Sequence, residues 1–555
     1  MENKLLILWS TIPSGGIRIG DIAEALEISP KQAGRYLKRW EAEGWLTFIP
    51  GRGRGNLSEI MWLKNVEEIY EEKALSLLDK EPVDVSSKYL AFAWSTASKL
   101  RLMNKLYTKF GFDKRTQDKL VVPRRYPFLA VHPLKAADAH SAHLSSSVFN
   151  RLVSITEDGE ILPELAHSWE VRPDRLRLFL KKDVSFHDGS ILVAEDAAAC
   201  LEKLRTNKHY RQLWSPIERI AVPAPLVIDL IHPEGCSYSL QLLSMICAGI
   251  YKEDKSRTLG TGSFILEENS SDKTVLTAFK EHFQERPLLD AVEFIQVPRD
   301  FQVVYRSAAS QEDASESKVI SDSGFGSVIM NAYRDSIISK PEVRNWIHRI
   351  ISKNSHTIHE YDPRASANQN GSLMVHPEPI RLPETERPVF KEPIIIRATD
   401  YTEKSTIWLK DTLEREGVPV SLRWCTFDEV IANTPASRNV DCFIHGEIFE
   451  MNQDLSYYIF LTNGLSPLYP ILAKDSKWIS CLHQYRHTPF SEWAALNRKL
   501  ERMLLEESIL IPLFYEKRQI PFSSELMNIK IKHLGYVDFS KLWVRPVIED
   551  ECGQN

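Results

Sequence analysis

Two short amphipathic segments followed by a glycine-rich basic turn constrain the fold of this chain most strongly. Residues 17–28 place apolar side chains at positions i, i+3, i+4 and i+7, which is the spacing of one helix face. Ser29 and Pro30 then supply a cap and a first-turn residue for a second helix, which ends at Gly44. Because only a few residues join the two helices, the sequence predicts a helix-turn-helix.

A basic β-hairpin is predicted directly after the second helix. The apolar runs 45–49 and 57–63 flank Gly-Arg-Gly-Arg-Gly-Asn at 51–56, and strand, glycine-rich turn and strand form a hairpin. Glycine lets the backbone approach a partner closely, and arginine reaches phosphates or a minor groove. The hairpin is therefore expected to be the wing of a winged helix.

The exposed face of the second helix and the tip of the wing carry the side chains that we expect to contact DNA. Lysine and arginine on phosphates supply affinity, whereas Arg, Gln or Asn on base edges supply sequence choice. The predicted contact residues are Lys31, Gln32, Arg35, Lys38, Arg39, Arg52, Arg54 and Asn56. A winged helix used for protein contacts, or a charge run that is only a solvated face, is the alternative.

Charge and length divide the chain into a basic head and an acidic body. Residues 1–125 hold 21 Lys and Arg against 16 Asp and Glu, whereas the remainder holds 48 against 59. This asymmetry favours an N-terminal part that binds a polyanion.

The length of the chain points to several domains. With 555 residues the chain is too long for one hydrophobic core, so we expect two or three domains. Helices are predicted over 60–80 and 87–110, the second basic enough to add DNA-backbone contacts or to be a solvated face.

Membrane, export and metal signals are not found in the sequence. No run approaches the roughly 18 apolar residues of a membrane span. The apolar run 5–9 is short for a signal peptide, so we interpret it as a first helix and expect a cytoplasmic protein without a membrane partner. The seven cysteines form no C-x-x-C pair, which predicts scattered buried thiols and no metal site.

From about residue 121 the chain resembles the family 5 solute-binding proteins, the oligopeptide- and dipeptide-binding-like proteins of ABC importers. The similar segments, in family order, are ILPELAHSWEV (161–171), LFLKKDVSFHDGSILVAEDA (178–197), GTGSFIL (260–266), SVIMNAYRDSIISKPEVRNWIHRIIS (327–352), a strand–helix–strand unit (393–431) and IPLFYEKRQ (511–519). The resemblance implies two α/β lobes joined by crossing strands, with the ligand in a cleft that closes by hinge motion.

Several family residues also have a local structural explanation. Residues 186–189 are typical of a strand end and tight turn, with glycine at positive φ. Asp196 falls in a first helical turn, where a carboxylate complements the helix dipole, and Trp169 is expected in the core. We therefore do not propose His187 and Asp188 as a catalytic pair.

The combination of both halves is similar to the SgrR-type transcriptional regulators. LEISPKQAGRYLKRWEAEGWL (26–46) and PGRGRG (50–55) carry this resemblance. It implies a regulator that binds double-stranded operator DNA and senses a small-molecule effector, namely a sugar, a sugar phosphate or a peptide, without a cofactor. A homo-oligomer remains open, since dimers read two-fold operators.

The predicted fold class is therefore multidomain, α+β winged helix-turn-helix followed by a two-lobed α/β periplasmic-binding-protein-like domain of type II, family 5. The predicted boundaries are 1–70 for the winged helix, 71–120 for a helical linker and 121–555 for the solute-binding domain. Lobe I is expected at about 121–325 and 508–555, and lobe II at about 326–507.

The ligand-binding residues are less well defined by the sequence. Peptide-binding relatives hold the peptide amino group with an acidic residue of the second lobe, and the matching region here is 440–461. Glu447 and Asp454 are the candidates, although the family's Asp-Pro is replaced by Asp454-Leu455. Trp424 is a candidate for aromatic stacking in the cleft. A surface carboxylate, or core packing for the tryptophan, is the alternative in each case.

Three other functions compete with the regulator. The first is the solute-binding component of an ABC importer for peptides. The second is an enzyme, but the sequence has no P-loop, no H-E-x-x-H, no G-x-S-x-G and no G-x-G-x-x-G after a strand, so no catalytic residue is predicted. The third is a DNA-binding protein whose large domain only mediates protein contacts.

Overall fold

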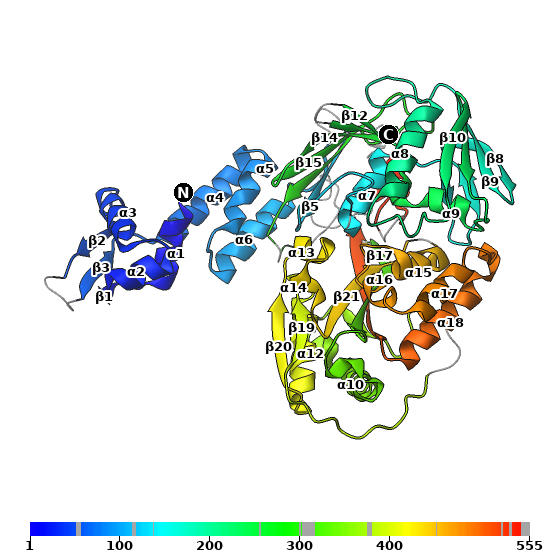
Figure 1. Cartoon of the computed structure of the whole chain (residues 1–555). Coiled ribbons are helices and arrows are strands. Elements are labelled where there is room, and N and C mark those ends of the chain that lie inside the picture. Colours follow the sequence, from blue (N-terminus) through cyan, green and yellow to red (C-terminus); the bar gives the residue numbers. More distant parts are fainter. Residues whose placement is uncertain are drawn as a thin grey trace, which may run out of the picture.

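The structure, a computed structural model, places a small N-terminal module beside a large two-lobed body (Figure 1). It describes residues 1–51, 57–113, 118–136, 138–254, 257–298, 301, 317–374, 380–450, 452–522, 526–531 and 536–545. Within these ranges no helix is long and apolar enough to cross a membrane.

The N-terminal module contains the predicted helix-turn-helix and hairpin strands. Its sheet has the order β1-β3-β2. Its elements are α1 (Asn3–Thr11), β1 (Gly15–Ile17), α2 (Ile19–Ala25), α3 (Pro30–Ala42), β2 (Leu46–Ile49) and β3 (Ser58–Trp62). Ser29 caps α3, because its Oγ accepts a hydrogen bond from the Gln32 amide at 3.3 Å. Leu37 and Trp40 are fully buried, as the helix face requires, whereas Tyr36 is only partly buried.

A helical segment joins this module to the body. Its elements are α4 (Val66–Lys80), α5 (Val83–Ser86), the 3₁₀ helix η1 (Ser87–Ala91) and α6 (Thr96–Tyr107). The helix predicted from residue 60 begins only at residue 66, because residues up to Trp62 complete β3 and Asn65 caps α4. The segment 87–110, predicted to be helical, forms η1 and α6.

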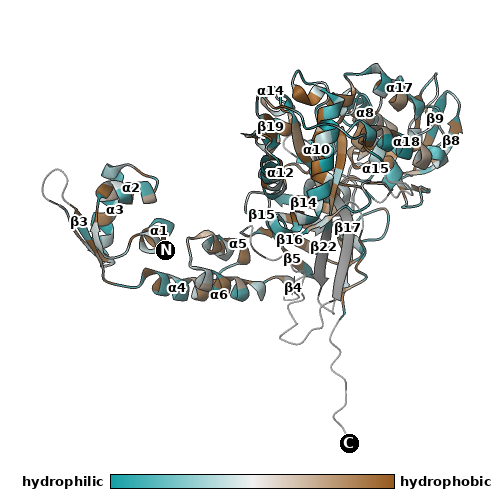
Figure 2. Cartoon of the chain, turned by 90° about the horizontal axis from the view of Figure 1, so that it is seen from below, coloured by the Kyte–Doolittle hydropathy of each residue, from teal (hydrophilic) through white to brown (hydrophobic). Residues whose placement is uncertain are grey.

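The joining segment is packed against the body. Figure 2, seen from below, shows α4 and α6 running from the winged helix to β4 and β5. One hydrophobic cluster includes residues of the winged helix together with Phe110, Val297 and Phe301. The Tyr107 ring stacks on Phe301 with 4.3 Å between centroids, and Lys88 pairs with Asp272 at 2.8 Å. The N-terminal module is thus coupled to lobe I by a continuous core.

Lobe I is built on two sheets. The five-stranded sheet has the order β14-β15-β16-β5-β4, with β16 and β5 parallel, and the four-stranded sheet has the order β10-β11-β9-β8. Two hairpins, β6-β7 and β12-β13, complete it. The elements are β4 (Gly111–Asp113), β5 (Lys119–Arg124), α7 (Ala139–Val148), β6 (Val153–Ile155), β7 (Ile161–Pro163), β8 (Ala166–Arg172), β9 (Arg175–Leu180), α8 (Ala194–Thr206), β10 (Arg219–Ala224), β11 (Val227–Ile231), α9 (Ser239–Ser244), η2 (Ile246–Ala248), β12 (Lys252–Asp254), β13 (Arg257–Leu259), β14 (Phe264–Asn269), β15 (Lys273–Ala278) and β16 (Ala291–Gln296).

Lobe II is built on a six-stranded sheet of order β18-β22-β17-β21-β19-β20. Two long strands, β17 (Ser317–Met330) and β22 (Leu510–Phe522), pair along their length and connect the lobes. The predicted strand–helix–strand unit is confirmed, since β19 and β20 are parallel and joined by α12. The other elements of this lobe are η3 (Ile337–Ser339), α10 (Pro341–Asn354), η4 (Ser355–Thr357), α11 (Ile358–Tyr361), β18 (Ala365–Ala367), β19 (Ile394–Ala398), α12 (Glu403–Arg415), β20 (Val420–Trp424), α13 (Phe427–Ile431), α14 (Pro435–Arg438), β21 (Cys442–Ile448), α15 (Gln453–Thr462), α16 (Tyr469–Leu472), α17 (Ser476–Gln484), η5 (Phe490–Glu492) and α18 (Trp493–Glu506). Toward the C-terminus follow β23 (Leu526–Met527), η7 (Phe539–Lys541) and β24 (Trp543–Val544).

Two of the segments that resemble the solute-binding family, 178–197 and 260–266, contact each other inside lobe I. His187 lies 3.0 Å through Nε2 from the Gly262 carbonyl oxygen, and its Nδ1 accepts from the Gly260 amide at 3.3 Å. A Cβ at Gly260 would lie 1.9 Å from the Val148 carbonyl oxygen, so only glycine fits there. Burial lowers the pKa of His187 to about 4. These contacts give His187 a scaffold role.

Two further sequence expectations have clear outcomes. Trp169, expected in the core, is only partly buried on β8, where it packs against the edge of the core. The cysteines of the described ranges are free thiols, and all except Cys481 are buried, as predicted. Within those ranges no cluster of three metal-ligating side chains is found.

Candidate DNA-binding and solute-binding sites

The outer face of α3 carries a stripe of exposed cations. Lys31, Arg35 and Lys38 follow one another at i, i+4 and i+7 and therefore lie on one side of the helix. In the described ranges none of the three forms an ion pair, so each ammonium or guanidinium group faces solvent. The stripe meets the elementary requirement for binding a polyanion.

The other predicted residues of α3 have partners within the module. The Gln32 Oε1 accepts from the Ser29 amide at 3.2 Å, which closes a capping box. The Arg39 guanidinium pairs with Glu2, and this hydrogen bond raises the pKa of Arg39. The indole of Trp40 also donates to Glu2 at 3.1 Å. Arg52, Arg54 and Asn56 lie outside the described residues.

Part of the contact between the lobes is filled by aromatic side chains. Tyr458 of lobe II donates a hydrogen bond through its hydroxyl to the Tyr238 hydroxyl of lobe I at 3.1 Å. Trp493 packs on both rings, with centroids 5.5 Å from Tyr238 and 4.8 Å from Tyr458. All three side chains are buried, which leaves a solute only the more polar parts of the interface.

The three predicted ligand residues come from separate elements. Glu447 on β21 lies 3.0 Å through Oε2 from Nε2 of His445 and is partly buried. Asp454 accepts from the buried Asn497 side chain at 2.8 Å and so ties α15 to α18. Trp424 ends β20 and is 51% exposed. No hydrogen bond, ion pair or ring contact joins these residues in the part of the chain that the structure describes.

A third carboxylate of the same segment reaches lobe I. Glu450 follows β21, and its charge, after the larger effect of burial, raises the pKa of the Cys247 thiol in lobe I. Nearby, the Asn452 side chain donates to the Glu157 carbonyl oxygen of lobe I at 3.1 Å. Glu450 lies within the segment 440–461 that was compared with the family, but nothing in its spacing distinguished it from Glu447.

A cavity of about 430 Å³ opens between the sheet of lobe II, the α13–α14 segment and the loop before α16. Four basic residues and one acidic residue contribute to its lining, namely Arg334, Arg397, Arg438, Lys474 and Asp335. Gly464, also at the cavity, donates its amide to the His209 carbonyl oxygen of lobe I at 2.7 Å. This site was not predicted from the sequence. The sequence feature that could have indicated it is the arginine within the apolar strand Ile394–Ala398.

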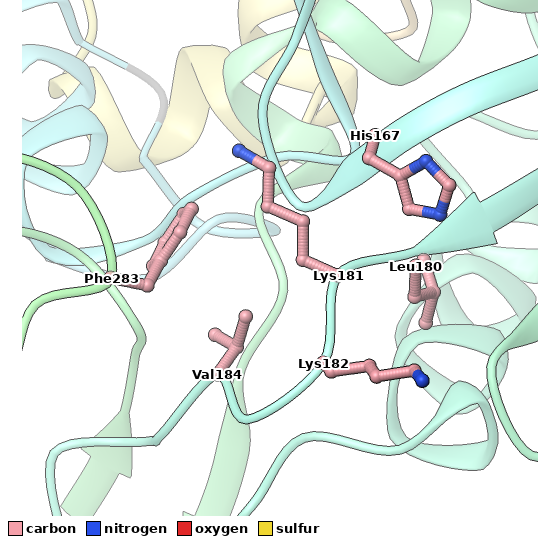
Figure 3. A pocket seen from close by; sticks show the side chains of 6 residues that line it. All are labelled: His167, Leu180, Lys181, Lys182, Val184 and Phe283. Atoms are coloured by element: carbon pink, nitrogen blue, oxygen red, sulfur yellow. The ribbon is translucent and has the colours of Figure 1, made fainter.

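A second hollow, of about 440 Å³, is lined only by lobe I residues (Figure 3). Lys181 lies between Phe283 and His167, with its Nζ 5.0 Å from the centroid of the Phe283 ring. Burial lowers the pKa of Lys181. Because lobe II contributes no residue to its lining, closure of the lobes would not reshape this hollow directly.

Comparison with protein families finds two matches in one chain. Residues 8–111 match the family described as sugar transport-related sRNA regulator, N-terminal, and residues 160–319 match the middle part of the bacterial extracellular solute-binding proteins, family 5. The HTH-type transcriptional regulator SgrR of Pectobacterium atrosepticum is 21% identical, over 98% of this chain and 99% of that protein. The regulator of the same name from Yersinia enterocolitica is 23% identical, over 98% and 99%.

Solved structures share the fold of the body. The oligopeptide-binding protein AppA from Bacillus subtilis, in complex with a nonapeptide, has a TM-score of 0.63 at 14% identity and covers 77% of this chain and 99% of that one. The periplasmic binding protein DppA from Helicobacter pylori, in complex with the peptide STSA, has a TM-score of 0.62 at 16% identity and covers 77% and 98%. The chain therefore matches the SgrR N-terminal domain over residues 8–111, continues into a family 5 solute-binding fold, and is similar over nearly its whole length to the SgrR regulators.

Proposed function

We propose that this protein is a ligand-responsive, DNA-binding transcription regulator. The observation that carries the proposal is the fusion of a basic helix-turn-helix, through one continuous hydrophobic cluster, to a two-lobed solute-binding fold. Relatives that match nearly the whole chain bear the name of HTH-type transcriptional regulators. The division into 1–70, 71–120 and 121–555 remains part of the proposal.

In this proposal α3 enters the major groove of operator DNA. Lys31, Arg35 and Lys38 supply phosphate contacts from the exposed stripe, while Gln32 and Arg39 exchange their present partners for DNA groups. Arg52, Arg54 and Asn56 of the wing complete the predicted contact set. DNA lies in the bacterial cytoplasm, so we place the protein there.

The effector binds between the lobes and biases their closure. Glu447, Asp454 and Trp424 remain candidate contacts, and Glu450 joins them because its charge acts on Cys247 of lobe I. A sugar, a sugar phosphate or a peptide is the proposed class. Closure reaches the winged helix through β16, Phe301 and α6, which pack in one cluster. The relatives are regulators and binding proteins, and we propose that this chain, too, has no catalytic activity.

A gel-shift experiment tests the proposal. The full-length protein is titrated onto the promoter DNA of its own gene at fixed salt, with unrelated DNA as competitor. Retention against excess competitor is expected. The double variant Arg35→Ala/Lys38→Ala should bind at least about tenfold more weakly because two phosphate contacts are lost. Lys73→Ala, an exposed change on α4, is the matched control and should bind like the parent.

The same experiment separates the regulator from a second candidate, the peptide-binding component of an importer. That candidate is favoured by the fold neighbours, which include peptide complexes. It leaves the N-terminal module without a role. Promoter binding no tighter than binding to competitor DNA, together with tight peptide binding, would favour the importer component.

A further inference from the structure

Arg397 is a buried cation in the middle of an apolar strand. Only 7% of the residue is exposed, and its neighbours on β19 include Ile394 and Ile396, which are fully buried. In the described ranges no carboxylate pairs with it. Burial lowers the pKa of its guanidinium to about 10. A buried charge without a counter-charge is costly unless something else compensates it.

The contacts of Arg397 are few for a buried arginine. It donates one hydrogen bond, to the Ser437 carbonyl oxygen at 3.2 Å, and lies 3.9 Å from the centroid of the Phe443 ring. Two other buried arginines are much better satisfied: Arg344 donates to three carbonyl oxygens at 2.8–2.9 Å, and Arg124 donates to two carbonyl oxygens and a threonine hydroxyl. Because a guanidinium has five N–H donors, Arg397 retains most of its donor capacity.

The cavity beside Arg397 has a positive lining. Arg334 is neutralised by its ion pair with Asp441. Arg438 and Lys474 are exposed at the cavity and form no ion pair among the described residues. The single acidic lining residue is also exposed. The cavity therefore favours a negatively charged group and disfavours a cation.

Asn331, another residue of the lining, carries a second unsatisfied group. The Asn331 amide donates to the Arg438 and Val440 carbonyl oxygens at 3.4 and 3.3 Å, while its buried Oδ1 accepts no hydrogen bond. In contrast, the Tyr333 hydroxyl is occupied, because it accepts from Trp478 and donates to Asp475. The cavity thus presents a cation that lacks an anion, whereas the unsatisfied Asn331 oxygen is buried beneath its surface.

We propose that this cavity binds a small organic anion, whose negative group contacts Arg397. Its volume of about 430 Å³ lies in the usual range of small-molecule sites. The inference rests on the proposed function, because the anion is taken to be the effector. Since every lining residue belongs to lobe II, the inference places the effector beside the contact between the lobes and not in the gap between them. Gly464 links the cavity to lobe I through its bond to His209, so the bound anion lies beside a contact between the lobes.

Calorimetric titration of the full-length protein at constant ionic strength tests the inference. The probes are inorganic phosphate, glycerol phosphate, citrate and, as the neutral control, glycerol. At least one anion should bind, and glycerol should not. Arg397→Gln should weaken that binding tenfold or more, whereas Arg415→Gln, which removes a charge from the same lobe away from the cavity, should leave it unchanged. The phosphate and citrate titrations decide which kind of anionic group is preferred.

A second variant covers the case in which Arg397→Gln does not fold, as judged by circular dichroism. Arg438→Gln/Lys474→Gln changes two exposed residues and should weaken anion binding severalfold. Absence of binding by all three anions, or equal binding by the parent and the folded variants, would overturn the inference. Gel shifts with the parent protein keep the two proposals apart: promoter binding by the parent leaves the regulator standing whatever the titrations show, whereas no promoter binding by the parent overturns the regulator itself.

Discussion

The stripe on α3 and the cavity at Arg397 are two groups of cations built in opposite ways. The stripe consists of residues within two turns of one helix, and all of them are exposed. The cavity gathers residues from the end of β17, from β19, from α14 and from the loop before α16, and its central cation is buried. Local spacing creates the first group, whereas only the tertiary fold creates the second.

The two groups also differ in what they demand of a ligand. Hydrated cations on α3 gain from phosphate contacts that remain salt-dependent and tolerant of position. The guanidinium of Arg397 is largely removed from solvent, so it favours one anion at one position. This difference suits a chain in which an exposed helix face binds a polymer and a cavity binds a small molecule.

The largest expected effect concerns the aromatic contact between the lobes. Trp493→Ala should destabilise the body by about 3–5 kcal/mol, because the indole is fully buried between Tyr238 and Tyr458. Trp424→Ala, at an exposed site of the same lobe, should change the free energy of unfolding by less than about 0.5 kcal/mol. Urea unfolding of both variants measures the difference. Equal effects would show that the aromatic contact does not hold the lobes together.

Acid should weaken the body through its buried histidines. Burial lowers the pKa of His348 to about 4, while the unfolded chain keeps a value near 6.5. The unfolded state therefore takes up the proton first, so this contribution is full above pH 6.5 and is lost as the pH falls toward 4, at up to about 1.4 kcal/mol per pH unit. Thermal unfolding between pH 7 and 4.5 should show a smaller loss in His348→Gln than in the exposed control His356→Gln. Identical pH dependence would argue against a neutral buried His348.

The contact of Gly464, in the loop before α16, with His209 of lobe I can be tested by adding a methyl group. A Cβ at Gly464 would lie 2.7 Å from the His209 carbonyl oxygen, so Gly464→Ala should cost about 1–3 kcal/mol or separate the lobes locally. Gly446→Ala, whose Cβ would meet nothing closer than 3.9 Å, is the control. Small-angle scattering and urea unfolding report the two responses. A Gly464→Ala protein as compact and stable as the control would remove this contact from the account.

The smallest effect is expected in the N-terminal module. Ser29→Ala removes the hydroxyl that caps α3 and should cost about 1 kcal/mol, seen as faster hydrogen exchange in the first turn of α3. Ser10→Ala, near the end of α1, should leave that exchange unchanged. If both variants exchange alike, the cap does not control the start of the helix.

Prediction from sequence succeeded where short-range chemistry determines the structure. Ser29, Pro30 and the i, i+4, i+7 spacing defined α3, and the alternation of strand and helix over 393–431 defined β19, α12 and β20. The helix expected from residue 60 began later because strand pairing prevailed over helical periodicity. Arg397, Asn331 and Gly464 could not be grouped in advance, because nothing local relates residues so far apart in the chain. Glu450 could have been weighed beside Glu447 and Asp454, since it shares their segment.

The salt dependence of promoter binding tests the central claim most directly. The affinity of the full-length protein for its own promoter is measured over a range of salt concentrations for the parent, for Lys31→Ala/Arg35→Ala/Lys38→Ala and for Lys73→Ala. We predict that the triple variant binds more weakly and that its slope of log affinity against log salt is flatter by about 0.9 for each lost phosphate contact, with Lys73→Ala unchanged. The same affinity and slope for the triple variant and the parent would contradict DNA binding by α3.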